Sequence, residues 1–219
     1  MAKIGLNSMT FNNDINILKN LKKDIDTYEC TKPFLLQNYL KLLDIGIECQ
    51  TFSSLIVNEY DLTNKSDRYR FLKEFKETCI LANDLGCSKL MFGMERFRKV
   101  INNDILKFFV ELLDIAKDYN MKLLYEAISN SKFLPNHKEL IKFTKEHNLD
   151  GIHVDFGTLI NENESLEDLA KETNILNIHA PFGLIIKDIP FDISYENYTK
   201  KSLTEKEIKE FLELIKCGK

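Results

Sequence analysis

The sequence predicts an α/β fold in which eight strand–helix units close into a (β/α)₈ barrel. Short apolar segments alternate with longer amphipathic segments along all 219 residues, and this alternation is typical of a parallel sheet. Eight segments are candidate strands, a number that favours a closed barrel over an open sheet. A chain of this length suits one domain, so we expect residues 1–219 to form a single barrel domain.

The candidate strands are short and apolar, and most are bounded by Gly, Asn or Pro, as buried parallel strands should be. They are Lys3–Ser8, Ile25–Cys30, Ile47–Phe52, Lys89–Gly93, Lys122–Ala127, Gly151–Phe156, Ile175–His179 and Phe191–Glu196. Each is followed by a longer segment, with one exception near the C-terminal end of the chain. This order places successive strands side by side in the barrel.

Four of the longer segments carry clear helix signals. Residues Asp67–Leu85 and Asp104–Tyr119 repeat apolar side chains at spacings of three and four, which is the period of an amphipathic helix. Gly86 follows the first of these as a helix stop. Two more helices are expected to open at Asn136, with Glu139 three residues on, and at Thr204, with Glu207, and the last to stop at Gly218.

The connection after the seventh candidate strand is too short for a complete unit. Only about a dozen residues separate His179 from Phe191, roughly the number that a crossover helix needs for itself. Two alternatives follow. Either the helix after the seventh strand is reduced to a loop, or the barrel is incomplete between the seventh and eighth strands.

The composition excludes several classes of protein. Charges of both signs are spread along the chain, with a net charge of −4 and no basic patch, so nucleic-acid binding is disfavoured. No apolar run suits a signal peptide or a membrane span. Five cysteines without a C-x-x-C pair predict free thiols. We expect a soluble cytoplasmic protein that binds no membrane; its oligomeric state stays open, with a homodimer as one alternative.

Three successive candidate strands end in a residue that can bind a metal: Glu126, Asp155 and His179. Active-site residues of such barrels lie at the carboxyl ends of the strands, so these side chains are expected to converge. Two carboxylates and one imidazole suit Mn²⁺, Mg²⁺ or Co²⁺, with Zn²⁺ as an alternative. Taken singly, each acid could be a turn or cap residue and the histidine a core residue, but three at consecutive strand ends favour a shared site.

Further polar residues near strand ends have two interpretations each. Glu196 either completes the site as a fourth ligand or lies in an exposed loop. His153, two residues before Asp155, faces the same side of its strand and either supports the site or packs inside the barrel. Glu29 and Gln50 end early strands and either contact a substrate or have turn or interior roles.

Arg98 follows the fourth candidate strand and either binds an anionic group of a substrate, because its planar fork suits phosphate or carboxylate, or forms a surface salt bridge. The two remaining histidines, His137 and His147, fall on a predicted helix away from the strand ends. We expect both to lie on the surface.

Several short segments, in this order and spacing, resemble the xylose isomerase-like TIM-barrel superfamily, which includes sugar phosphate isomerases and epimerases. They are IECQTFSS, LANDLGCSKLMFGMERFRK, DIAKDYNMKLLYEA, HVDFG and NIHAP. The sequence also departs from the family pattern. Thr158 stands where the family often has a histidine, and HAPFGLII lacks the arginine or aspartate that often follows the histidine of the seventh strand.

The resemblance implies a divalent metal held by Glu126, Asp155, His179 and Glu196. It further implies an isomerase or epimerase of a sugar or sugar-like hydroxy-ketone, in which the metal stabilises an ene-diolate and the two glutamates move protons. The departures favour an alternative, a non-catalytic barrel that binds a sugar-like ligand or a partner protein. A metal-dependent hydrolase or lyase on the same residues is a third alternative.

Overall fold

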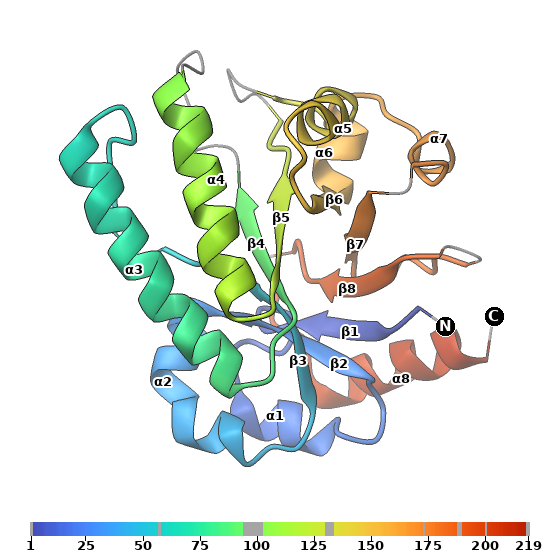
Figure 1. Ribbon diagram of the computed structural model, residues 1–219. Coiled ribbons are helices and arrows are strands. Elements are labelled where there is room, and N and C mark those ends of the chain that lie inside the picture. The colour runs from blue at the N-terminus through green and yellow to red at the C-terminus, as the bar shows by residue number, and fades with distance from the viewer. Residues whose placement is uncertain are drawn as a thin grey trace.

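Eight parallel strands form a closed barrel in chain order (Figure 1), as the sequence predicts. The computed structural model describes residues 2–56, 58–93, 103–129, 134–172, 174–187, 190–199 and 201–217. The strands are β1 (Ile4–Asn7), β2 (Thr27–Thr31), β3 (Glu48–Ser53), β4 (Lys89–Gly93), β5 (Lys122–Glu126), β6 (Gly151–Asp155), β7 (Ile175–Pro181) and β8 (Asp192–Glu196). Every predicted strand is therefore present.

Helices surround the barrel (Figure 1). They are α1 (Ile15–Asn20), α2 (Lys32–Leu43), α3 (Lys65–Asp84), α4 (Asn103–Asp118), α5 (His137–Glu146), α6 (Phe156–Asn161), α7 (Leu166–Leu169) and α8 (Glu205–Lys216). The four predicted helices are α3, α4, α5 and α8. The caps are as expected: the Asn136 side chain accepts from the Glu139 backbone N–H, and Thr204 and Glu207 form a capping box. Gly86 has φ of +69° after α3, whereas Gly218 lies outside the described residues.

The barrel is complete where the sequence left two alternatives. Residues Asn177–Pro181 of β7 pair with Asp192–Glu196 of β8, and β8 pairs with β1. No helix occurs in the connection from β7 to β8, among its described residues 182–187 and 190–191. The crossover helix is thus replaced by a loop. The loop residue Phe182 packs against Phe211 of α8, with ring centroids 4.3 Å apart.

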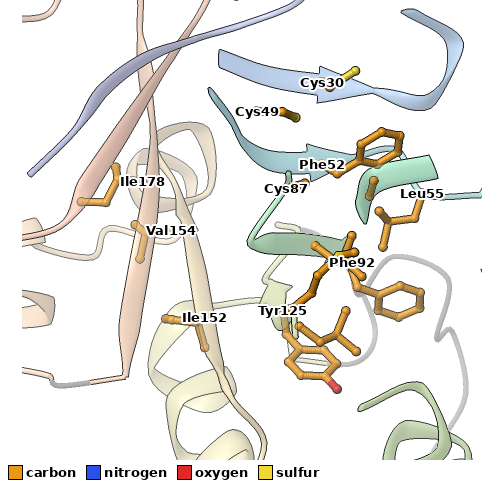
Figure 2. Packing of buried hydrophobic residues seen from close by; sticks show 14 of the residues in the cluster. Cys30, Cys49, Phe52, Leu55, Cys87, Phe92, Tyr125, Ile152, Val154 and Ile178 are labelled. Carbon is orange, nitrogen blue, oxygen red and sulfur yellow. The ribbon is translucent and has the colours of Figure 1, made fainter. Parts of the chain in front are cut away.

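The main apolar core lies between the barrel wall and the helices (Figure 2). Tyr125 of β5 points into this layer, where its ring centroid is 5.6 Å from that of Phe109 and 6.3 Å from that of Phe92. Successive side chains of a strand point to opposite faces of the sheet. The outward direction of Tyr125 therefore turns its neighbour Glu126 toward the interior of the barrel.

Two expectations about the environment of the chain can be compared with the structure. All five cysteines are free thiols, four buried and Cys217 exposed, as the sequence predicts. Among the residues that the structure describes, none of the helices is both long and apolar enough to cross a membrane.

Candidate metal centre

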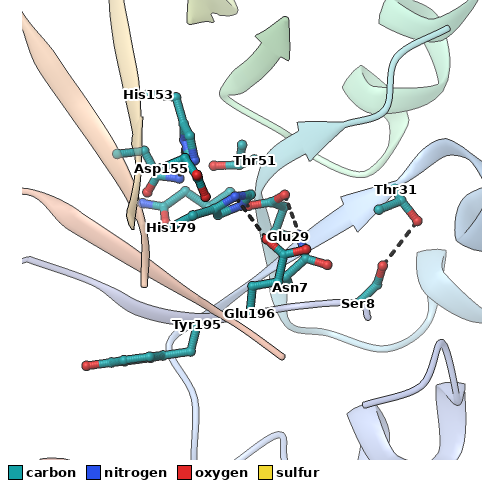
Figure 3. A network of polar contacts seen from close by, with 12 residues as sticks. Asn7, Ser8, Glu29, Thr31, Thr51, His153, Asp155, His179, Tyr195 and Glu196 are labelled. Atoms are coloured by element: carbon teal, nitrogen blue, oxygen red, sulfur yellow. Dashed lines mark hydrogen bonds and ion pairs between the residues drawn. The ribbon is translucent and has the colours of Figure 1, made fainter. Parts of the chain in front are cut away.

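The predicted strand-end residues come together at the carboxyl ends of the barrel strands, and Figure 3 shows Asp155, His179 and Glu196 among them. Glu126 ends β5, Asp155 ends β6, His179 lies near the end of β7, and Glu196 ends β8. Asp155 and His179 are register partners in adjacent strands. Parallel strands present such residues at one mouth of the barrel, so the convergence expected from spacing alone is present.

His179 is the centre of the cluster. Its Nε2 atom lies 2.5 Å from Glu29 Oε2, and its Nδ1 atom lies 3.2 Å from Glu196 Oε2. Glu126 Oε1 is 3.9 Å from the same Nδ1 atom. Glu196 therefore lies in this cluster at the end of β8 and not in an exposed loop.

The charges around His179 shift its titration. Burial by itself would lower the pKa of His179, but the carboxylates of Glu29, Glu196 and Glu126 raise that pKa to about 10. Burial raises the pKa of Glu196, an effect that the charge of His179 opposes. Without a bound metal, His179 is therefore an imidazolium at neutral pH, held between two carboxylates.

Glu29 has an interior role rather than one in direct substrate contact. Its side chain is fully buried, and its Oε1 atom accepts a hydrogen bond of 2.7 Å from Asn7 Nδ2. Asn7 Oδ1 in turn accepts from the Met9 backbone N–H. A carboxylate behind a histidine fixes the orientation of the ring and its tautomer. Asn7 was not predicted as a site residue, although its position at the end of the first candidate strand was a signal.

His153 is also part of the cluster. It is fully buried and is the register partner of Glu126. Its ring centroid lies 4.1 Å from that of His179, and its Nε2 atom lies 3.9 Å from Glu126 Oε1. Burial, together with the charges of His179 and other cationic groups, holds the pKa of His153 well below its usual value. His153 is therefore a neutral imidazole, the form that binds metals.

Asp155 has a structural task at the same mouth. It caps α6, because its Oδ1 atom accepts from the Thr158 backbone N–H at 2.7 Å. Its Oδ2 atom accepts from the Tyr198 hydroxyl at 2.6 Å. Tyr198 lies two residues after Glu196 and was not predicted. Proximity to Glu196 in the sequence was the only signal for it.

The prediction that His137 lies on the surface is wrong. His137 is fully buried, its Nδ1 atom is 2.7 Å from Glu164 Oε2, and its Nε2 atom accepts from the Asp155 backbone N–H. The first residue of α5 faces inward beneath the end of β6, which the helical pattern did not reveal. His147 is exposed, as predicted.

Gln50 does not lie in the site, contrary to one of its two interpretations. Its Nε2 atom donates to Asp192 Oδ2 at 2.6 Å, and Asp192 also accepts from Lys89. Lys89 and Asp192 are the first residues of β4 and β8, so this network lies at the opposite end of the barrel. Gln50 thus has the interior polar role. Arg98 lies outside the described residues, so its interpretation stays a prediction.

A cavity of about 230 Å³ opens beside Glu126. Its walls come from the ends of β3, β4 and β5, with Leu55, Ile56, Met91, Phe92 and Ile128 beside Ser54 and Gly93, and polar atoms make up slightly more of the lining surface than apolar atoms. A small molecule in this cavity would lie against the Glu126 side chain.

The donor atoms fit a divalent metal. One ligand atom each from Glu126, His153 and His179 lie within 4.8 Å of one another, and all three residues are buried. His153 Nε2 has no hydrogen-bond partner among the described residues. A buried polar atom without a partner is unfavourable, and a metal ion would satisfy it. The fold and the site therefore define a barrel with a candidate metal centre at the carboxyl ends of its strands.

The comparisons with known proteins agree with this fold. No protein-family model and no curated protein matches the chain, but solved structures do. The IolI protein with a bound zinc atom has a TM-score of 0.76 at 18% identity, covering 99% of this chain and 97% of that one. D-psicose 3-epimerase from Clostridium cellulolyticum H10, with D-tagatose, has a TM-score of 0.77 at 11% identity, covering 98% of each.

A third similar structure is 3-keto-D-glucoside 4-epimerase, YcjR, from E. coli. Its TM-score is 0.74 at 13% identity, and the match covers 99% of this chain and 100% of that one. At these identities the likeness establishes the fold. The chain therefore shares the xylose isomerase-like TIM-barrel fold. This agrees with the fold that the resemblance of its sequence motifs implies.

Proposed function

We propose that the chain is a divalent-metal-dependent isomerase or epimerase of a sugar or sugar-like hydroxy-ketone. The observation that carries the proposal is the approach of Glu126 and Glu196, from different strands, to one nitrogen of His179, with Glu126 also lining an open cavity. The names of the similar structures support the substrate class, because two of them are sugar epimerases. The zinc atom of the IolI structure supports the metal.

Glu126, His179 and Glu196 would hold the metal, with Asp155 as the fourth residue that the family resemblance implies. When bound, the metal supplies a Lewis acid for the carbonyl and neighbouring hydroxyl of the substrate. Glu29 keeps the His179 ring in place through its contact with Nε2, so that Nδ1 faces the mouth. Tyr198, at the same mouth, holds Asp155 from the solvent side.

The two glutamates are suited to proton transfer. One carboxylate takes the proton from the carbon next to the carbonyl, the electron pair of that C–H bond moves toward the carbonyl, and the proton is later returned to carbon. Return to the neighbouring carbonyl carbon, together with passage of the hydroxyl proton to the former carbonyl oxygen, isomerises the sugar, whereas return to the opposite face of the same carbon epimerises it. Burial raises the pKa of Glu196, which brings it closer to the range in which a carboxyl both gives and takes a proton at neutral pH.

The direct test is solvent exchange at substrate carbon. The purified protein, loaded with Mn²⁺ or Co²⁺, is incubated in D₂O with a panel of ketopentoses and ketohexoses, and deuterium incorporation next to the carbonyl is followed by NMR after removal of the metal. We expect incorporation into at least one sugar. Glu196→Gln should slow it at least about 100-fold, whereas Glu210→Gln, an exposed residue of α8, should leave it unchanged.

Two results would overturn the proposal. The first is the absence of exchange in every sugar of the panel while at least one sugar binds, which favours the non-catalytic barrel. The second is exchange by Glu196→Gln at the rate of the unchanged protein, which removes the proposed proton carrier.

A further inference from the structure

His153 is placed where a ligand would be, one layer deeper in the barrel than Asp155. It pairs in register with Glu126 across β5 and β6, and with Asn177 across β6 and β7. Both His153 Nε2 and His179 Nδ1 lie 3.9 Å from the same Glu126 Oε1 atom. This separation is too long for hydrogen bonds, so neither histidine nitrogen is hydrogen-bonded to that Glu126 oxygen.

His153 and Asp155 differ in their burial and in their hydrogen bonds. His153 is fully buried, and its Nε2 atom has no hydrogen-bond partner among the described residues. Asp155 is only half-buried, and hydrogen bonds from Thr158 and Tyr198 engage both of its carboxylate oxygens. A metal ion would therefore satisfy an unmet group at His153, whereas at Asp155 it would have to compete with bonds already made.

Asn177 provides the means to set the tautomer of His153. Its buried side-chain amide lies 3.2 Å from His153 Nδ1, and its Oδ1 atom has no partner among the described residues. An amide can present either its oxygen or its nitrogen to a neighbour after half a turn. With Oδ1 against Nδ1–H, the proton of the neutral ring stays on Nδ1, and Nε2 presents its lone pair to Glu126 and His179.

We propose that His153 Nε2 binds the metal together with Glu126 and His179, and that Asn177 is the positioning residue that fixes the tautomer of His153. This inference rests on the proposed function, since it concerns the same metal. Two imidazole nitrogens and a carboxylate suit Zn²⁺ or Co²⁺ better than Mg²⁺, which prefers oxygen ligands. The preferred ion is therefore of the borderline class, unlike the mostly oxygen-liganded site that Glu126, Asp155 and His179 alone would make.

The test measures metal binding and does not depend on turnover. The full chain is stripped with a chelator and titrated with Co²⁺, Zn²⁺ and Mg²⁺ by calorimetry, and Co²⁺ binding is also followed by visible absorption. His153→Gln should weaken Co²⁺ binding by about 100-fold or more, and Asp155→Asn by less than about 10-fold. Asn177→Leu should weaken it by about 10-fold, and Asn177→Asp, which keeps the acceptor, should restore it.

A second measurement uses only the unchanged protein, so it does not depend on the folding of a variant. In the Co²⁺-loaded chain, proton NMR should show two paramagnetically shifted imidazole N–H signals, from His153 Nδ1–H and His179 Nε2–H. A single shifted N–H signal would overturn the inference, as would His153→Gln binding Co²⁺ like the unchanged protein. If the unchanged protein binds none of the three ions, both this inference and the proposed function are overturned.

Discussion

The contact between Glu29 and His179 offers a quantitative test of the electrostatics in the barrel. Glu29→Gln keeps the size of the side chain and an acceptor oxygen but removes the charge 2.5 Å from His179 Nε2. The pKa of His179 is about 10 in the fold, against an ordinary 6.5. Because this pKa is raised, the imidazolium stabilises the metal-free fold fully below pH 6.5, and this contribution is lost as the pH rises through about 10.

The linked free energy of unfolding is on the order of 3 kcal/mol at pH 7.5 and about 1 kcal/mol at pH 9.5. Glu29 makes the largest favourable contribution to the shift, so Glu29→Gln should remove most of it. The assay is urea unfolding of chelator-treated protein at both pH values. Glu48→Gln is the matched control, because its ion pair with Lys3 has a similar length but is exposed and should contribute less than about 1 kcal/mol. An equal loss at both pH values, or none, would refute the reasoning.

Two further stability predictions concern other buried polar groups. Lys32→Met should destabilise the fold by about 3 kcal/mol, because it removes the cation 2.7 Å from the buried carboxylate of Glu74. Adding Glu74→Met should recover part of that loss in urea unfolding. A double variant that is less stable than Lys32→Met alone would contradict this. Tyr125→Phe should leave the free energy of unfolding unchanged or raise it by up to about 1 kcal/mol, because the buried hydroxyl has no hydrogen-bond partner among the described residues. A clear drop in the free energy of unfolding or in the melting temperature would contradict this.

The strands could be predicted from the sequence because burial on both faces leaves a plain signal. All eight predicted strands exist, and their ends agree with the structure to within two residues. The meeting of Glu126, Asp155 and His179 followed from the same signal, since residues at successive strand ends share one mouth in a parallel barrel, whereas the sequence left Glu196 between two interpretations. Length and periodicity were enough for both conclusions.

Side-chain partners deeper in the barrel depend on register, which the sequence does not encode locally. The pairing between β2 and β3 shifts at Tyr28/Glu29, so that Glu29 pairs with Thr51 and Gln50 falls out of the simple alternation. A similar shift occurs at Ile152/His153 between β6 and β7. Because such irregularities redirect side chains, counting from strand ends could not choose between the two interpretations of Gln50 or between those of His153.

The hydrogen bond between Glu29 and His179 joins residues that are 150 positions apart. A chain emerging from the ribosome carries Glu29 long before its partner exists, and Glu196 arrives later still, on the strand that must pair with β1 to close the barrel. Contacts between residues so far apart in the sequence form late in folding, because closing the long loop between them costs conformational entropy. The cluster of Glu29, His179 and Glu196 therefore forms only when the barrel closes. A partly synthesised chain that contains Glu29 and His179 does not yet have the assembled site.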